Sequence, residues 1–149
     1  MKKKLSLFLS IMLCLSMFAG CDKQDAAENN GIYTEYEGIY LTLESTKVEE
    51  DAFGKEYTSF NLRLHNETDK NGEYDASYEI EYKDGEIWRS VLNADIAWDA
   101  VLYMVLPNGA ANIGANTRGF DVSREGTYRI LLDFSVDGIT YNTWAEFVV

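Results

Sequence analysis

The chain of 149 residues is long enough for one domain with its own hydrophobic core. It carries 25 Asp and Glu residues against 13 Lys and Arg residues, and this acidic excess argues against nucleic acid as a partner, because phosphate backbones would be repelled. One histidine and two cysteines are too few for an ordinary zinc site, so neither a metal nor a cofactor is expected.

Residues 1–20 have the pattern of an export signal. Lys2–Lys4 form a positive start, residues 5–18 are mostly apolar, and Ala19 and Gly20 are small. The apolar stretch is too short to span a bilayer, which needs about 20 apolar residues. Removal of the three lysines with the signal takes the formal net charge from −12 to −15. The sequence therefore predicts a strongly acidic protein outside the cytoplasm.

The run Phe18-Ala19-Gly20-Cys21 resembles the lipobox of bacterial lipoproteins, although that family usually has leucine in place of the phenylalanine. The resemblance implies that the signal is cut before Cys21 and that the thiol carries membrane lipid. The domain would then be anchored on the extracytoplasmic face of the cell membrane. Cys14 leaves with the signal, so Cys21 keeps no disulfide partner. An ordinary secretory signal with an incidental cysteine is the alternative.

The segment that follows is polar and charged and has no apolar periodicity, which is typical of a flexible spacer. We therefore expect three parts: a lipoprotein signal peptide at 1–20, the lipidated cysteine with its spacer at 21–35, and one domain at 36–149.

From Ile39 onward apolar and polar residues alternate in short runs, as in β-strands with one buried face. Two runs show this best, with inward side chains expected at Ile39, Leu41, Leu43, Phe60, Leu62 and Leu64. Turn signals separate the runs at Asn71-Gly72, Asp84-Gly85, Asn108-Gly109 and Asp137-Gly138. The pattern predicts an all-β fold, an antiparallel sandwich of about seven strands.

The last two strands form the hairpin whose register the sequence defines best. A two-residue type I′ loop at Asp137-Gly138 sets Val136 opposite Ile139. Counting back gives the other pairs: Phe134 with Tyr141, Ile130 with Ala145 and Tyr128 with Phe147 on an apolar face, and Arg129 with Glu146 and Asp133 with Asn142 on the other. Leu131 then faces outward opposite Trp144. We expect another element to cover this pair, and the alternative is an exposed apolar spot.

A second hairpin is predicted around Asp84-Gly85. A two-residue loop there would put Trp88 on the same face as two glutamates, outside the core. Because a tryptophan beside glutamates gains little from burial, we expect a bulge at Ile87-Trp88 that turns both side chains inward. Residues 93–106 fit either a short helical turn capped by Asn93 or a strand that ends at the single proline.

Residues 124–130, Arg-Glu-Gly-Thr-Tyr-Arg-Ile, match the Gly-x-Tyr-x-apolar pattern at the start of strand F in immunoglobulin-like domains. The order of further segments resembles the bacterial Ig-like domains of Firmicutes lipoproteins over about residues 38–149, with the matching segments at 64–68, 84–88, 106–109 and 134–138. The resemblance implies an extracytoplasmic β-sandwich in which Tyr128 is a tyrosine corner, bonded through its hydroxyl to the backbone. It carries no agreed biochemical activity. The loops at Pro107-Asn108-Gly109 and Arg124-Glu125 depart from the usual pattern.

The candidate catalytic and metal-binding residues favour plainer interpretations. Nucleophilic catalysis needs a base, most often histidine, and His65 falls on the polar face of its strand, so we expect a surface residue there. Residues 67–75 copy the first part of a calcium-binding EF-hand loop, but Tyr78 stands where the bidentate glutamate belongs. We expect a polar loop turned by Asn71-Gly72, with weak binding of a divalent ion as the alternative.

The expected function is that of a non-catalytic protein-interaction or structural module of the cell envelope, held by membrane lipid through Cys21 and contacting an envelope protein. One alternative is a surface module that binds a carbohydrate or a peptide. Its site residues would be Trp144 and Leu131, because they form the outward apolar pair. A proteinase inhibitor is the other alternative, since some exported inhibitors are Ig-like sandwiches with protruding loops.

Overall fold

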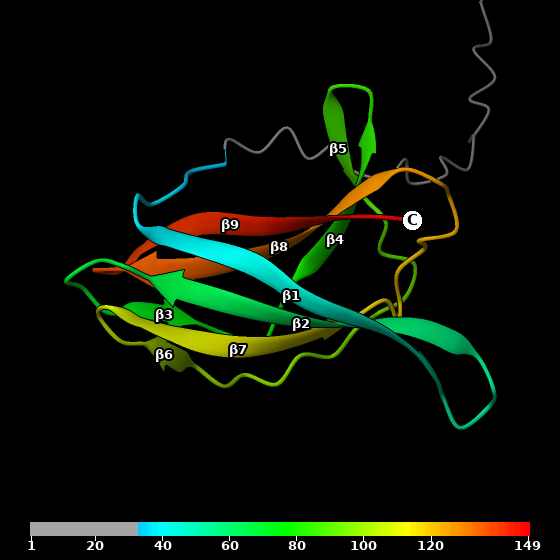
Figure 1. The fold of residues 1–149 in the computed structure, drawn as a ribbon, viewed down its shortest axis with the longest axis horizontal. Coiled ribbons are helices and arrows are strands. Elements are labelled where there is room, and N and C mark those ends of the chain that lie inside the picture. Colours follow the sequence, from blue (N-terminus) through cyan, green and yellow to red (C-terminus); the bar gives the residue numbers. More distant parts are fainter. Residues whose placement is uncertain (1–32) are drawn as a thin grey trace, which may run out of the picture.

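The computed structural model describes residues 33–149, which form two antiparallel β-sheets packed face to face (Figure 1). The predicted signal peptide and Cys21 lie outside the described residues. Among the described residues, no helix is long and apolar enough to cross a membrane. The prediction of an all-β antiparallel sandwich is confirmed.

The smaller sheet has three strands in the order β1-β2-β7. They span Ile39–Glu50 (β1), Glu56–Asn66 (β2) and Gly109–Asn116 (β7). In β2 the predicted alternation is confirmed, since Phe60, Leu62 and Leu64 are buried while the residues between them are exposed. The pairing of β1 with β2 shifts register between Leu43 and Ser45, which marks a β-bulge in β1.

The larger sheet has six strands, with the path β5-β4-β8-β3-β6 and with β9 added to β8. Its strands span Gly72–Tyr74 (β3), Glu79–Asp84 (β4), Ile87–Ser90 (β5), Tyr103–Val105 (β6), Thr127–Val136 (β8) and Ile139–Val148 (β9). β8 is the central strand: β9 pairs with one edge, while β4 and β3 pair one after the other with the second edge. The described residues form nine strands where about seven were predicted, and two of the nine, β3 and β6, are only three residues long.

The core lies between the sheets and is richest along β8, where both faces of the strand are buried. Fully buried apolar side chains come from both sheets: Leu62 and Leu64 from β2, Ile80 from β4, Val105 from β6, and Tyr128, Ile130, Leu132, Phe134 and Val136 from β8. Because Arg129 and Leu131 of β8 point away from this core and are also buried, a second layer must cover the outer face.

The tyrosine corner predicted from the family resemblance is present. The Tyr128 hydroxyl donates a hydrogen bond to the carbonyl oxygen of Arg124 at 2.7 Å, as expected. Gly126, just before β8, has φ of +146°, and a Cβ there would lie only 2.8 Å from the ring of Tyr82. Glycine is therefore required at this position by both backbone and space. Gly126 and Val149 exchange two backbone hydrogen bonds, which fixes the C-terminal residue at this corner.

The register predicted for the last hairpin is confirmed at every pair. Val136 lies opposite Ile139 and Leu131 opposite Trp144, and the remaining partners follow without a shift. Asp137 and Gly138 have φ of +53° and +78°, as a type I′ loop requires.

The hairpin of β4 and β5 differs from the prediction by one residue. Asp84 pairs with Ile87, so the loop is Gly85-Glu86, and Gly85 at its first position has φ of +66°. Lys83 lies opposite Trp88, and the pairing runs from the loop to the end of β5 without a register shift, so the predicted bulge is wrong. Trp88 therefore faces outward, on the side of β4 that carries Glu81. The reason becomes clear from what lies next to it, described below.

Residues 93–106 do not form a helical turn. The chain is irregular until β6 and then turns tightly into β7, so the strand alternative is correct only for its last part. Asn108 has φ of +52°, and the amide of Gly109 donates to the carbonyl oxygen of Leu106 at 3.1 Å. Proline at the second and asparagine at the third position are what a type II turn favours.

The loop between β2 and β3 is turned by a different residue from the one predicted. Gly72 begins β3 and packs closely against Val105, so Asn71-Gly72 does not make the turn. The buried side chain of Asn66 organises the loop instead. Its Oδ1 accepts from the amide of Thr68 at 3.0 Å, and its Nδ2 donates to the carbonyl oxygen of Lys70 at 2.7 Å. An asparagine side chain that replaces a backbone partner in this way is an Asx turn.

Candidate functional surfaces

The outer face of the larger sheet holds a buried ion pair. Glu81 of β4 and Arg129 of β8 are cross-strand neighbours. Arg129 Nε donates to Glu81 Oε2 at 2.6 Å, and Nη2 lies 2.6 Å from the same oxygen. Only 3% of the arginine side chain and none of the glutamate side chain is exposed. Two charges withdrawn from water in this way need close partners on every side.

Three aromatic rings supply that cover. The guanidinium carbon of Arg129 lies 4.1 Å from the ring centre of Tyr33, 4.4 Å from that of Trp88 and 5.1 Å from that of Trp144. At such distances the negative ring faces attract the cation. This explains why Trp88 turns outward: it gains a charged neighbour that the sequence places far away, in β8. We call Tyr33, Glu81, Trp88, Arg129 and Trp144 the arginine cluster.

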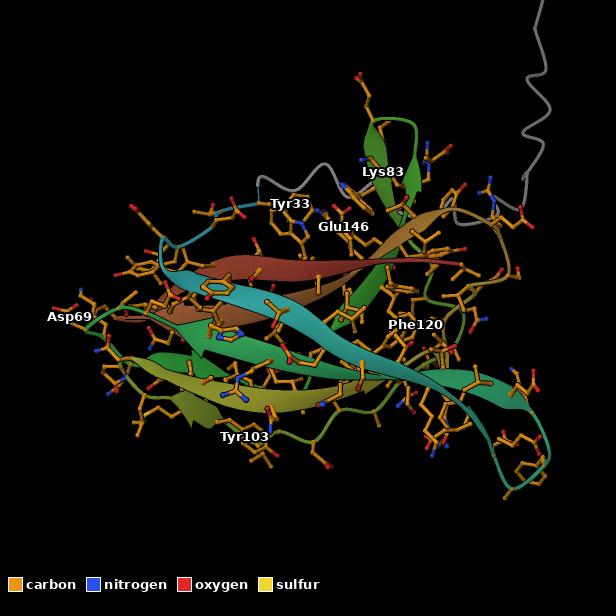
Figure 2. The ribbon with its side chains drawn as sticks, viewed as in Figure 1. Tyr33, Asp69, Lys83, Tyr103, Phe120 and Glu146 are labelled. Carbon is orange, nitrogen blue, oxygen red and sulfur yellow. The ribbon has the colours of Figure 1, made fainter. Side chains whose placement is uncertain are left out.

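Tyr33 joins the start of the described chain to this cluster. Its hydroxyl donates to Glu81 Oε1 at 2.9 Å, and its ring meets that of Trp144 edge to face, with centres 6.2 Å apart. Burial, and then the hydrogen bond to Glu81, raises the pKa of Tyr33 above its usual value. The next residue, Thr34, accepts a backbone hydrogen bond from Asn142 of β9 at 2.8 Å. The chain thus enters the domain along the outer face, as Figure 2 shows for Tyr33 beside β9.

The outward pair Leu131 and Trp144, predicted as a ligand surface, is covered, as expected. Leu131 is only 6% exposed, and Trp144 is half-buried against Tyr33 and Arg129. In this structure Leu131 is a packing residue, and Trp144 offers part of its indole ring to solvent. Their assignment to ligand binding stays a prediction.

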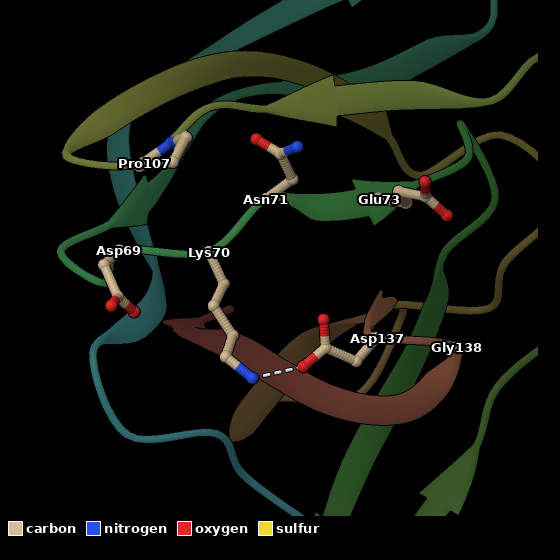
Figure 3. A pocket seen from close by; sticks show the side chains of 7 residues that line it. All are labelled: Asp69, Lys70, Asn71, Glu73, Pro107, Asp137 and Gly138. Atoms are coloured by element: carbon tan, nitrogen blue, oxygen red, sulfur yellow. Dashed lines mark hydrogen bonds and ion pairs between the residues drawn. The ribbon is translucent and has the colours of Figure 1, made fainter.

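A polar pocket lies at one end of the sandwich, where the β2–β3 loop, the β6–β7 turn and the β8–β9 loop meet (Figure 3). Its lining includes Asp69 and Glu73 of the EF-hand-like segment. Their side chains lie at opposite sides of the pocket, and Lys70 forms an ion pair with Asp137 between them. Among residues 33–149, no group of three or more His, Cys, Asp or Glu side chains is placed to hold a metal ion.

His65 lies on the outer face of the smaller sheet, and its prediction as a surface residue is confirmed. The ring is half-buried, stacks on Tyr40 with centres 4.7 Å apart, and lies 3.0 Å from Thr42 Oγ1 through Nε2. Thr42 Oγ1 also contacts Glu44 at 2.8 Å. These contacts form a polar network along neighbouring strands, which is an ordinary way to cover an outer sheet face.

A row of exposed apolar side chains precedes and includes β6. The exposed fraction is 66% for Leu102 and 61% for Leu106, and the row, which we call the apolar strip, consists of Trp98, Val101, Leu102, Tyr103, Met104 and Leu106. Several exposed apolar side chains along one segment are a feature of interaction sites on soluble domains. The strip was not among the predicted site residues, although an apolar run without alternation, from Ala100 to Leu106, was a signal for it in the sequence.

Comparison with known proteins identifies the fold family. A family model described as "Bacterial Ig-like domain" matches residues 38–148. No curated protein matches significantly. The X-ray structure of Northeast Structural Genomics Consortium target SoR45 is similar, with 14% identity over 76% of this chain and 87% of that chain and a TM-score of 0.50. The crystal structure of a FixG-related protein from Vibrio parahaemolyticus aligns with 11% identity, 76% and 97% coverage, and a TM-score of 0.36. The chain belongs to the bacterial Ig-like domain family, whose members are typically non-catalytic.

Proposed function

We propose that this protein is a non-catalytic module of the cell envelope, anchored by lipid on Cys21 to the extracytoplasmic face of the membrane, and that it binds another protein. The lipobox-like run before Cys21 supports the anchor. Between Cys21 and Tyr33 a fully extended chain reaches at most about 40 Å, so such an anchor would keep Tyr33 within that distance of the membrane.

The apolar strip is the observation that carries the binding function. Its members include Trp98, Tyr103 and Met104, residue types that are enriched at protein interfaces. Exposure of several such side chains along one segment costs solubility, and a partner that covers them would gain from their burial. The strip lies away from Tyr33, where the chain enters from the anchor: Figure 2 shows Tyr33 and Tyr103 on opposite sides of the molecule. The surface is therefore free to meet a partner while the anchor is in place.

A ligand surface at Trp144 has less support. Its ring already contacts Tyr33 and Arg129, and the Leu131 side chain opposite it is buried. Only the part of the indole ring that faces solvent is left for a sugar or a peptide to stack on.

The test is site-specific photocrosslinking in intact cells with the full chain. A photoreactive amino acid replaces Leu102 in the strip or, as a matched control, Val48 of β1; their exposed fractions are 66% and 65%. We expect one reproducible protein adduct from position 102 and none from position 48. The same adducts from both positions, or none from either, would contradict the proposal.

The anchor is tested separately. Cys21→Ser should abolish incorporation of labelled fatty acid and move the protein from the membrane fraction to the soluble fraction. Retention of the label in this variant would show that Cys21 is not the lipidated residue.

A further inference from the structure

β7 forms a free edge of the smaller sheet. It pairs with β2 along its whole length and with no other strand among the described residues (Figure 1). Successive residues of an antiparallel strand direct their backbone groups alternately to the two sides. The side that faces away from β2 can be identified at Asn116. Both its amide and its carbonyl group hydrogen-bond the Tyr78 hydroxyl, at 2.8 and 2.9 Å, so they point away from β2.

The alternation then fixes the other outward groups. Counting back in steps of two from Asn116 gives Gly114, Asn112 and Ala110, whose N–H and C=O groups face the open edge. The residues between them are bonded to β2. The hollow on this side is lined by Asn112, Ile113 and Gly114 of β7 and has a volume of about 230 Å³. A Cβ built on Gly114 would have no heavy atom within 4 Å, so the outer face of the sheet is open there and leaves room for the side chains of an added strand.

The two edges of the smaller sheet differ in how they resist strand pairing. β1 carries a bulge and several charges, including Lys47, Glu49 and Glu50, which are features that protect an edge from pairing with another chain. β7, with the sequence GAANIGAN, has no charged residue and no proline, and its pairing with β2 shows no register shift. An edge strand that lacks these protective features can pair with a strand of another chain.

The surroundings of the edge are apolar and acidic. Tyr103 of the apolar strip lines the hollow together with Tyr74, and the two rings stack with centres 5.5 Å apart. Two carboxylates, Glu73 and Asp75, flank Tyr74 of the hollow, and Asp95 and Asp99 lie on either side of Trp98 in the sequence. Among the described residues, the one Lys or Arg that pairs with β7 is Arg63 of β2, opposite Asn112 on the outer face. A second copy of this chain would bring the same carboxylates and a net charge of −12 against them, so charge disfavours self-pairing.

We propose that the partner adds an extended segment to β7 as a fourth strand, with alternating apolar side chains and with Lys or Arg beside them. The backbone of the segment would pair with Ala110, Asn112 and Gly114, and one apolar side chain would enter the hollow beside Tyr103. Main-chain bonds give such complexes affinity, and pockets for alternate side chains give specificity. This inference rests on the proposed function, because it names the binding mode of the same partner surface.

The test begins with a library of random ten-residue peptides, displayed and selected on the full chain in detergent micelles. We expect the selected peptides to share alternating apolar residues and at least one Lys or Arg. Selected peptides of acidic or irregular sequence, or none at all, would overturn the inference.

Amide hydrogen exchange tests whether the peptide pairs with β7. In the complex with a selected peptide, amide hydrogen exchange should slow by at least tenfold at Ala110, Asn112 and Gly114. Ala111, Ile113 and Ala115 should change little, because β2 already protects them. Asn112→Pro removes an outward N–H and places a ring where the new strand would lie, so affinity should fall at least tenfold. Asn112→Ala keeps the backbone and should bind within twofold of wild type.

Equal loss in both variants, or uniform protection along β7, would overturn strand addition. If Asn112→Pro does not fold, the exchange pattern of the wild-type complex decides alone. A crosslinked partner at position 102 with no selected peptide would leave the proposed function standing and refute only the strand-addition mode.

Discussion

The ion pair between Glu81 and Arg129 should dominate the stability of the outer face, and Glu81→Gln tests this. The replacement keeps the size of the side chain. Its one oxygen can face Arg129 while its NH2 group donates to the Tyr33 hydroxyl oxygen, so what it removes is mainly the negative charge. With only 3% of the Arg129 side chain exposed, the arginine charge is then buried without its counter-ion. Breaking a buried pair from one side costs about 3–5 kcal/mol.

Because the amide oxygen can still accept from Arg129, we expect the lower end of that range. Urea unfolding of the full chain measures it: a loss of about 3 kcal/mol moves the midpoint down by about 2 M at the slope expected for a small domain. The matched control is Asp84→Asn, which breaks the pair of Asp84 and Arg89 on the same hairpin. There the side chains are 49% and 33% exposed, and the loss should be under about 1 kcal/mol.

A second variant separates charge from packing. Glu81→Leu combined with Arg129→Met removes both charges and keeps apolar contact with the surrounding rings, and the methionine sulfur suits aromatic neighbours. The double variant should recover most of the loss, because the desolvation cost of both ions disappears. A loss below about 1 kcal/mol in Glu81→Gln, or a double variant weaker than the single one, would refute the buried-pair reasoning.

Three further predictions concern single groups. Tyr128→Phe removes the hydrogen bond to the Arg124 carbonyl group and should lower the unfolding free energy by about 1 kcal/mol, measured by urea titration; an unchanged midpoint would show that the corner is not stabilising. Partial desolvation, and then the charges of Glu81 and Asp133, raise the pKa of Glu79 above its usual value. Because this residue is exposed and water screens the effect, its ionised form costs only a little stability, which is lost as the pH rises from the usual pKa through the raised one. Glu79→Gln should therefore melt higher than wild type at pH 7 and equally below about pH 4, and a lower melting temperature at pH 7 would contradict this. The hydrogen bond from Lys47, assisted by neighbouring hydroxyls, lowers the pKa of Glu49 to about 2. The stability that Glu49 adds is thus present above its unfolded pKa and is lost as the pH falls toward 2, and a carboxyl NMR titration with a midpoint above 4 would disprove it.

The strands that local rules determine could be predicted from the sequence. The β8–β9 hairpin follows from unbroken alternation and from Asp137-Gly138, two residues that tolerate positive φ. The Tyr128 corner is equally local, because its hydroxyl reaches back only to Arg124. Within these segments the chain itself supplies every constraint that fixes the structure.

The wrong predictions concern positions where a contact with a residue elsewhere in the chain determines the structure. Trp88 faces outward beside two cations, Lys83 at 5.4 Å and Arg129 at 4.4 Å from the centre of its ring, and the nearer of the two lies on another strand, outside residues 78–92. The turn predicted at Asn71-Gly72 is wrong because hydrogen bonds of the Asn66 side chain to the backbone of Thr68 and Lys70 already turn the chain before residue 71. The exposure of the apolar strip could not be predicted for a different reason. Alternation indicates which face of a strand is buried, but residues 100–106 are apolar without alternation, and Leu102 is 66% exposed.

The central position of β8 has a consequence for how the chain folds. β9 is joined to β8 by a two-residue turn, so this hairpin can form in microseconds. The other edge of β8 pairs with strands far back in the sequence, since Glu73 lies opposite Ser135 and Glu79 opposite Leu131. Because these pairs close long loops, this edge forms more slowly, in milliseconds to seconds. During that interval an apolar strand with an unpaired edge faces solvent, a state that aggregates easily. The excess of 25 acidic over 13 basic residues keeps neighbouring unfinished chains apart while the sandwich closes.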